Sequence, residues 1–495
     1  MIKGVGSQTA LMVQPLFDMR RQLDDLQRQL GTGKKADTYA GLGLDRGLTV
    51  GLRTQLSSMD GYDDTIANVG LRANLAQSSL TRMAAIGRDV KSAAFKASTG
   101  GVGVSHETAY AALGEIVGLL NVQAGDRYLF SGQATDKPSV ASLDEMLNGD
   151  GVRAGLKQLI SERNQADLGA SGLGRLVISN PAPGTVAMAE DAVGSAFGFK
   201  LAGVNSSLTG ATATGPAGAP ASVSVALGAN PVAGETVQFR FDLPDGSHEI
   251  IALTATASAT PGKNEFSIGA TANATAVNLQ GALTTAVTEL ADTALTAASA
   301  IAASDNFFTA GGAQPPQRVA GPPFNTATGL VAGTPSDTVS WYTGEAGSDP
   351  ARGTATARID PSITVSYGLR ANEDAIRDSL RHVAVLAAVN FNAADPNAAA
   401  RVEELNSRVG IALDGAPGAQ RIETIQAELA GAQSSIAAAK DRHRQTAAVV
   451  GDMLEYIEGA PNEEVAAKML ALQTRLQASL QTTAMLYQMS LAKLL

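Results

Sequence analysis

Cysteine is absent from this chain of 495 residues. Because the cysteine thiolate is the attacking group in thiol catalysis and the ligand in cysteine zinc sites, both kinds of chemistry are excluded. Disulfides are excluded as well, so burial alone must hold the fold together. Aromatic residues are also scarce, at 4 %, and Trp341 is the single tryptophan. We therefore expect cores built mainly from aliphatic and small side chains.

Long apolar runs are missing too. No stretch reaches about 18 uninterrupted apolar residues, so the sequence predicts no transmembrane helix and no membrane insertion. The first six residues, MIKGVG, show no apolar signal segment, and we expect any secretion to use a route that leaves this N-terminus intact. Basic charge is outnumbered, with 37 Lys and Arg against 47 Asp and Glu, a formal net charge of -10. This balance argues against binding to nucleic acid or to an anionic membrane.

Apolar residues nevertheless make up 44 % of the chain, which is enough for buried cores, and the length predicts two to four domains. Both ends carry heptad patterns, in which apolar residues recur at alternating steps of three and four. Near the N-terminus this pattern runs from residue 16 to residue 30, and Gly31-Thr32-Gly33 is predicted to end the helix. Longer seams cover residues 62–94, 106–124, 376–390, 402–413, 422–457 and 465–480.

These seams predict a helical body formed by pairing the two ends of the chain. In the longest C-terminal seam, Val450, Met453 and Ile457 are expected to share one face. The large seam residues predicted to form the core of the rod are Ile66, Val69, Leu80, Met83, Val90, Leu113, Leu120, Ile425, Leu429, Ile436 and Val450.

Residues 141–359 differ in composition, because Gly, Pro, Ala and Thr dominate and period-two alternation replaces the heptads. Val223, Val225 and Leu227 alternate with small or polar residues, and residues 237–243 do the same before a turn at 244–247. Helices are expected at about 143–160 and 275–303, and loops at 311–349. The predicted fold is mainly α: a long antiparallel coiled-coil or helical-bundle rod, formed by the N- and C-terminal segments, with a mixed α/β insertion.

Three layers of organisation follow. Residues 1–60 and 461–495 are predicted to be terminal coiled-coil assembly segments, 61–140 and 360–460 the helical rod, and 141–359 an outward insertion domain. The terminal stripes are one-sided and need partners, which implies self-assembly. The residues predicted to form this assembly interface are Leu16, Met19, Leu23, Leu26, Leu30, Met469, Leu472, Leu476, Leu480, Leu486 and Leu491.

Signals of catalysis are weak. None of the four histidines, His106, His248, His382 and His443, belongs to an HExxH pattern, and a packed histidine is the better interpretation. The GTGKK segment at 31–35 lacks the first glycine and the final Ser or Thr of a phosphate-binding loop. Paired carboxylates lie on expected polar helix faces. We therefore predict no catalytic, cofactor-binding or metal-binding residue and no enzymatic activity.

Three groups of residues stand out: QLDDLQRQLGTGKK at 22–35 followed by YAGLG at 39–43, RYLFSG at 127–132, and LQTRLQAS at 472–479 with the last five residues. These groups resemble the flagellin superfamily, and within it the hook-filament junction proteins of alphaproteobacteria, the third hook-associated proteins. The match covers roughly residues 1–140 and 360–495.

This resemblance implies a secreted structural subunit of the bacterial flagellum, with terminal coiled coils lining a tube. The implied partners are copies of the chain in a helical ring, a neighbouring hook-associated protein, flagellin, and an export chaperone of the flagellar type III apparatus. It also implies that the terminal segments are disordered in the free monomer and fold on assembly. Three alternatives remain open: flagellin itself, a secreted adhesin that displays the insertion, and a secreted enzyme that uses it.

Overall fold

The computed structural model describes residues 5–98, 104–310, 315–392, 394–415 and 417–492. The chain forms two compact units. Unit 1 consists of Met1–Val69, Arg358–Val365 and Ser434–Leu495, and unit 2 consists of Gly70–Ala357 and Ser366–Gln433. The helices α2 (Arg46–Ser98) and α10 (Ile422–Glu458) contribute residues to both units.

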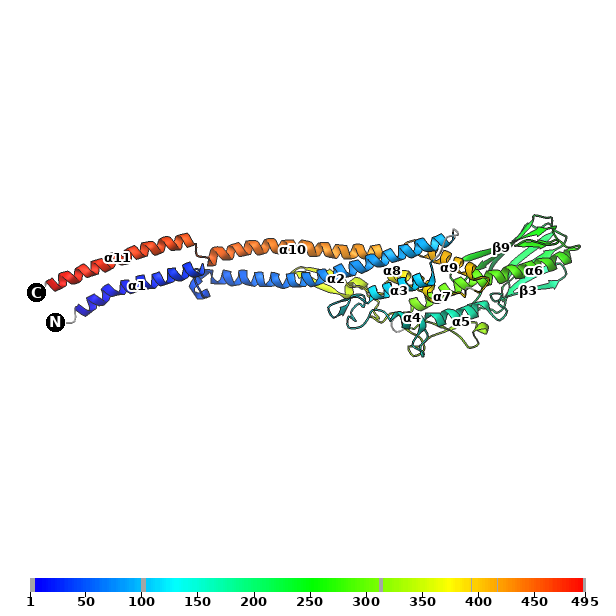
Figure 1. The fold of residues 1–495 in the computed structure, drawn as a ribbon, viewed down its shortest axis with the longest axis horizontal. Helices are drawn as coiled ribbons and strands as arrows, with labels where there is room; N and C mark the ends of the chain where they lie inside the picture. The colour runs from blue at the N-terminus through cyan, green and yellow to red at the C-terminus, as the bar shows by residue number, and fades with distance from the viewer. Residues whose placement is uncertain (1–4, 99–103, 311–314, 393, 416, 493–495) are drawn as a thin grey trace. The chain divides into compact units, whose positions relative to one another are not determined.

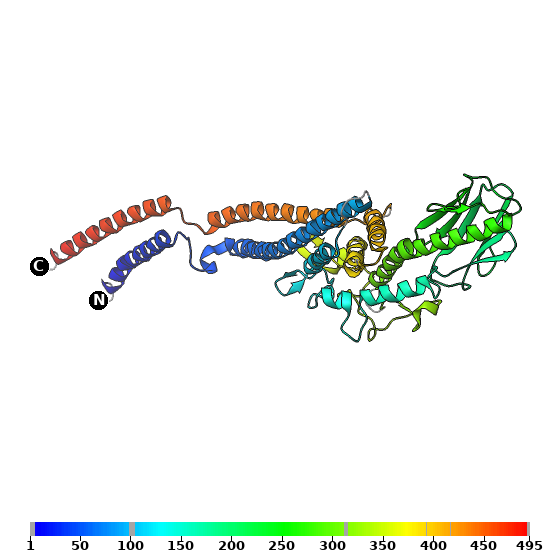
Figure 2. The same cartoon turned by 45° about the vertical axis from the view of Figure 1, so that its right-hand side comes forward.

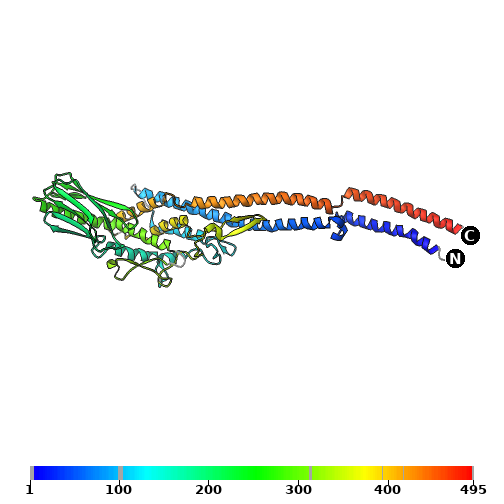
Figure 3. The ribbon, with the colours of Figure 1, turned by 180° about the vertical axis from the view of Figure 1, so that it is seen from behind.

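Unit 1 is built from paired helices. Helix α1 (Val5–Thr32) lies beside α11 (Asn462–Ala492), as Figures 1 and 3 show. The turns that end α1 and α10 are joined by hydrogen bonds, because Lys35 N–H donates to the carbonyl of Glu458 at 2.7 Å and Ala460 N–H donates to that of Gly33 at 2.8 Å. The break between α1 and α2 therefore lies next to the break between α10 and α11.

Helices α2 and α10 run antiparallel. In unit 2, Gln433 Nε2 donates to Asn74 Oδ1 at 2.7 Å and Gln426 Nε2 donates to Thr81 Oγ1 at 2.8 Å. Seven residues forward on α2 thus correspond to seven residues back on α10, which is one heptad on each helix. In unit 1 the same pairing buries Leu52 with Val450 and Ile457.

The rest of the helical body belongs to unit 2. Its helices are α3 (His106–Leu120), α4 (Leu143–Asn148), α5 (Leu156–Leu168), α7 (Thr296–Thr309), α8 (Asp374–Ala388) and α9 (Ala398–Ala412). One large apolar core joins these helices to the adjoining parts of α2 and α10. Trp341 is fully buried in it, and its indole N–H donates to the carbonyls of Phe308 and Ala310.

The insertion contains two four-stranded sheets. One has the order β3-β4-β7-β6 and the other β10-β9-β8-β5. The strands are β3 (Leu176–Ala182), β4 (Thr185–Glu190), β5 (Lys200–Ser206), β6 (Ala211–Ala217), β7 (Ser222–Leu227), β8 (Thr236–Asp242), β9 (His248–Thr256) and β10 (Glu265–Ser267). Helix α6 (Ala272–Leu290) packs against strands of both sheets and shares one core with them (Figure 2).

The predicted fold class is confirmed. The chain is 54 % helical, its N- and C-terminal helices pack together, and a β-sheet insertion lies between them in the sequence. The strands expected at 223–227 and 237–243 are present as β7 and β8, and β8 pairs antiparallel with β9, so that Phe239 faces Ile251.

Several details differ from the sequence predictions. The helix expected at 143–160 is two helices, α4 and α5, because Gly149 adopts φ 77° and ends the first. Met453 is exposed and Leu454 packs with the seam instead, since a step of four after Val450 satisfies the heptad as well as a step of three.

Candidate functional site

The terminal helices α1 and α11 form the first candidate surface. Leu16, Met19, Leu23 and Leu26 are half-buried in the described single chain, and Leu30 is 38 % exposed. On α11, Leu472 is buried at 8 % exposure, Met469 and Leu476 are half-buried, and Leu480 is 50 % exposed. The side chains of Leu486 and Leu491 lie outside the described residues.

The structure thus brings the predicted assembly residues of α1 and α11 onto neighbouring helices, but it does not enclose them. Two helices cover only one side of each other's stripe, and the other side stays open to water. Phe17, Leu470 and Met485 are exposed on the same two helices. These apolar surfaces therefore remain open to water in the single chain.

The residues predicted for the core of the rod are buried, all at less than 9 % exposure. Ile66, Val69, Ile436 and Val450 belong to unit 1. The others belong to the large core of unit 2, namely Leu80, Met83, Val90, Leu113, Leu120, Ile425 and Leu429.

His443 is the buried polar centre of the α2–α10 pair in unit 1. Its Nδ1 lies 3.1 Å from Asp63 Oδ1 on α2, and its Nε2 lies 3.6 Å from Asp360 Oδ2. Asp360 belongs to the short hairpin β13 (Thr356–Asp360) and β14 (Ile363–Ser366). Burial opposes ionisation of Asp360, but hydrogen bonds from Ser362 and Arg442 outweigh it and lower the pKa. His443 therefore fastens this hairpin to both long helices.

The turns between the paired helices form the second candidate surface, which sequence reasoning missed. Arg53 Nε and Nη2 donate to Glu458 at 2.9 and 2.6 Å, and this ion pair raises the pKa of Arg53 and lowers that of Glu458. The Arg53 guanidinium also lies 5.8 Å from the ring centre of Tyr39. On the other side, Lys35 Nζ donates to the carbonyls of Tyr456 and Ile457 and lies 5.7 Å from the Tyr456 ring.

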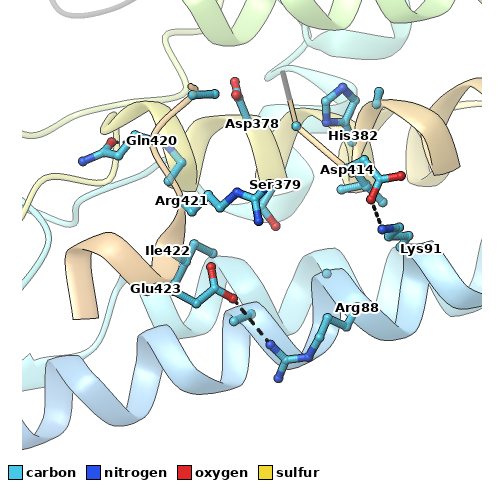
Figure 4. A pocket seen from close by; sticks show the side chains of 17 residues that line it. Arg88, Lys91, Asp378, Ser379, His382, Asp414, Gln420, Arg421, Ile422 and Glu423 are labelled. Atoms are coloured by element: carbon cyan, nitrogen blue, oxygen red, sulfur yellow. Dashed lines mark hydrogen bonds and ion pairs between the residues drawn. The ribbon is translucent and has the colours of Figure 1, made fainter. Parts of the chain in front are cut away.

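A cleft in unit 2 is the third candidate (Figure 4). It encloses about 310 Å³ between α2, α8 and the start of α10. Two pairs of opposite charges face each other across the opening: Lys91 contacts Asp414, and Arg88 lies 3.7 Å from Glu423. His382 lines the cleft from α8, and burial, with a smaller effect of Arg381, lowers its pKa to about 3 despite the opposing backbone carbonyl of Asp378.

The chemistry available in this cleft is limited. An imidazole with a pKa of about 3 is neutral at pH 7, far from the pKa that suits a general base. In the described chain the side-chain Nδ1 of His382 has no hydrogen-bond partner. The cleft is therefore best described as a gap between packed helices, in which opposite charges at the rim offset one another.

No protein-family model matches the chain, and no curated protein matches it significantly. Within the described residues, none of the helices has the length and apolarity needed to cross a membrane. In the same part of the chain, no three His, Asp or Glu side chains gather in a way that suits a metal ion.

Proposed function

We propose that this chain is a secreted structural subunit of the bacterial flagellum that joins the hook to the filament by helical self-assembly. The observation that carries the proposal is the incomplete burial of the apolar stripes on α1 and α11, from Leu16 to Leu30 and from Met469 to Leu480. Apolar surface of this length is costly in water and becomes buried when copies stack side by side.

Two further observations support this function. The pairing of the N- and C-terminal helices, with a separate insertion between them in the sequence, is the architecture that the resemblance to the flagellin superfamily implies. The QLDDLQRQLGTGKK segment, which carries that resemblance, covers the end of α1 and its turn. We propose copies of the chain, an adjoining hook-associated protein, flagellin and an export chaperone as its partners.

Electron microscopy of a strain that lacks the gene tests the proposal. For a junction protein we expect hooks without filaments and flagellin shed into the medium, because the filament has no base on which to assemble. If this chain were flagellin, the strain would shed no filament protein. Intact filaments and normal swimming, with or without a loss of surface attachment, would contradict the proposed function.

A further inference from the structure

Two arginines line a small pocket on unit 2. The pocket lies between α2, the hairpin of β1 (Gln123–Ala124) and β2 (Arg127–Tyr128), and the segment that follows β14. Arg72 lines it from α2, and Arg127 lines it from β2. Among the described residues that line this pocket, none is acidic. Positive charge is therefore concentrated here, in a chain whose formal net charge is -10.

The two guanidinium groups have donors to spare. In the described part of the chain neither Arg72 nor Arg127 forms an ion pair, whereas Arg82 on the same α2 helix pairs with Glu115. Arg72 Nη1 donates to the hydroxyl of Tyr367 at 3.3 Å. Because an arginine carries five N–H donors and no acceptor, most donors of both side chains remain available to a ligand. In the cleft of Figure 4, by contrast, opposite charges offset one another.

Hydroxyl groups add to these donors. The Tyr367 hydroxyl accepts from Arg72, so its own O–H is left to donate. Tyr128 and Thr135 also line the pocket and carry hydroxyls. Each described polar side chain in the lining can therefore donate a hydrogen bond, and the two arginines can do nothing else. Such a set of donors favours a ligand with negatively charged oxygens.

Backbone hydrogen bonds fix the walls of the pocket before any ligand binds. The N–H of Tyr128 donates to the carbonyl of Thr135 at 3.0 Å, and the N–H of Gly132 donates to that of Leu369 at 3.0 Å. All four of these residues line the pocket. Since the walls are held in place, little ordering of the backbone opposes binding.

The size of the pocket selects among anions. Its volume is about 40 Å³. A water molecule needs roughly 10–15 Å³ by this measure, so the pocket has room for about three waters. A carboxylate group is planar and has three heavy atoms, and it matches the planar fork of a guanidinium. A tetrahedral phosphate is larger and fits this space less well.

We infer that this pocket binds a single carboxylate group, held by Arg72, Arg127 and the Tyr367 hydroxyl. The shared chemistry allows two sources, a free small carboxylate or an acidic side chain of another protein. The pocket lies in unit 2, away from the stripes of α1 and α11, so the proposed function stands whether or not a carboxylate binds here.

A titration of the full-length chain with acetate tests the inference, with acetate replacing chloride at constant ionic strength. NMR of the arginine Nε–H groups reports the binding. We expect the signals of Arg72 and Arg127 to shift and to saturate. Arg72→Gln and Arg127→Gln should each weaken binding by roughly ten-fold or more, because each removes charge-assisted hydrogen bonds to the carboxylate. Arg240→Gln is the matched control, since it removes an exposed arginine of β8 that does not line the pocket.

Circular dichroism checks that the three variants are folded. The inference is overturned if the wild-type signals do not saturate, or if Arg72→Gln and Arg127→Gln bind acetate as tightly as Arg240→Gln. Once acetate binding is established, a photo-crosslinking residue in place of Thr135 identifies the source of the carboxylate in cells. A covalent product with a protein assigns the group to an acidic side chain, and the absence of such a product assigns it to a free small molecule.

Discussion

One buried histidine makes the stability of unit 2 depend on pH. His382 is 4 % exposed on α8, and burial lowers its pKa to about 3, with Arg381 acting in the same direction. In the unfolded chain the same imidazole has an ordinary pKa near 6.5. Below that pH the unfolded state takes up a proton that the folded state refuses until about pH 3, so His382 contributes a loss of stability as the pH falls.

We predict that His382→Gln flattens this pH dependence. Between about pH 6 and pH 4, the free energy of unfolding of the wild type should fall by about 1.4 kcal/mol per pH unit from this residue alone. Urea unfolding at pH 7, 6, 5 and 4 measures the slope. His248→Gln removes a histidine whose side chain is exposed and serves as the matched control. Equal slopes in all three proteins would refute the assignment.

Arg408 anchors the insertion to α9. Its Nη1 lies 3.0 Å from Asp245 Oδ2 in the turn between β8 and β9, and its Nη2 lies 2.5 Å from Glu249 Oε1. Both Arg408 and Asp245 are less than 10 % exposed. A buried pair of this kind gives little net stability, but removal of one partner leaves the other charge without compensation.

We predict that Arg408→Met destabilises unit 2 by about 3–5 kcal/mol, because it leaves Asp245 buried and unpaired. The comparison is Arg82→Met, which breaks the exposed pair with Glu115 and should cost far less, because water screens an exposed ion pair. Urea unfolding of both variants measures the two losses. Similar losses for the two substitutions would show that Arg408 is not a special anchor.

At the scale of helices and strands, periodicity was informative wherever one face of an element is buried by one neighbour. Ile66, Leu80 and Ile425 are buried as their seams predicted, and β7 alternates as expected. Strand β6 was not predicted, because Ala211–Ala217 contains only small residues and is largely exposed, so that it has no apolar alternation. Its place in the sheet depends on pairing with β7, a contact that its own sequence does not encode.

The candidate surfaces likewise show which features sequence periodicity reveals and which it does not. The stripe of α1 was visible because its heptad is isolated by charged neighbours such as Arg20 and Asp24. The exposure of Val449 and Met453 was not visible in the sequence, because both sit beside true seam residues and the pattern does not distinguish two adjacent apolar faces. Tyr39 and Arg53 come together only through the 3-10 helix η1 (Tyr39–Asp45).

We predict that Leu26→Asp leaves unit 2 folded and prevents incorporation into the flagellum. Leu26 is half-buried on the α1 stripe, and a charge placed in a seam that closes on assembly costs about 3–5 kcal/mol per copy. Gln27→Asp adds the same charge to the exposed face of the same turn and is the matched control. Circular dichroism checks the fold, and electron microscopy of the complemented deletion strain checks assembly. Normal filaments with Leu26→Asp would contradict the role of the stripe.

Across the whole chain, the stability of the two units is expected to be unequal. Unit 2 contains two large cores with fully buried aromatic side chains, among them Trp341, Phe239 and Phe307. In unit 1, α2 and α10 pair along a narrow seam that includes Ile66 and Ile436 and ends in a small cluster of Leu52, Val450 and Ile457 with two half-buried leucines. Helices with so little tertiary contact open at a low free-energy cost, because isolated helices are marginal in water.

We therefore predict that the amide hydrogens of α1 and α11 exchange rapidly in the isolated full-length chain and slowly once it is assembled. The amides of α8 and β8, which lie in the cores of unit 2, should be protected in both states and serve as the internal control. Hydrogen-exchange mass spectrometry of the monomer and of purified hook-filament junctions measures the difference. Equal protection of α1 and α8 in the monomer would mean that the terminal stripes are already satisfied within one molecule, and the chain would then have no energetic reason to polymerise.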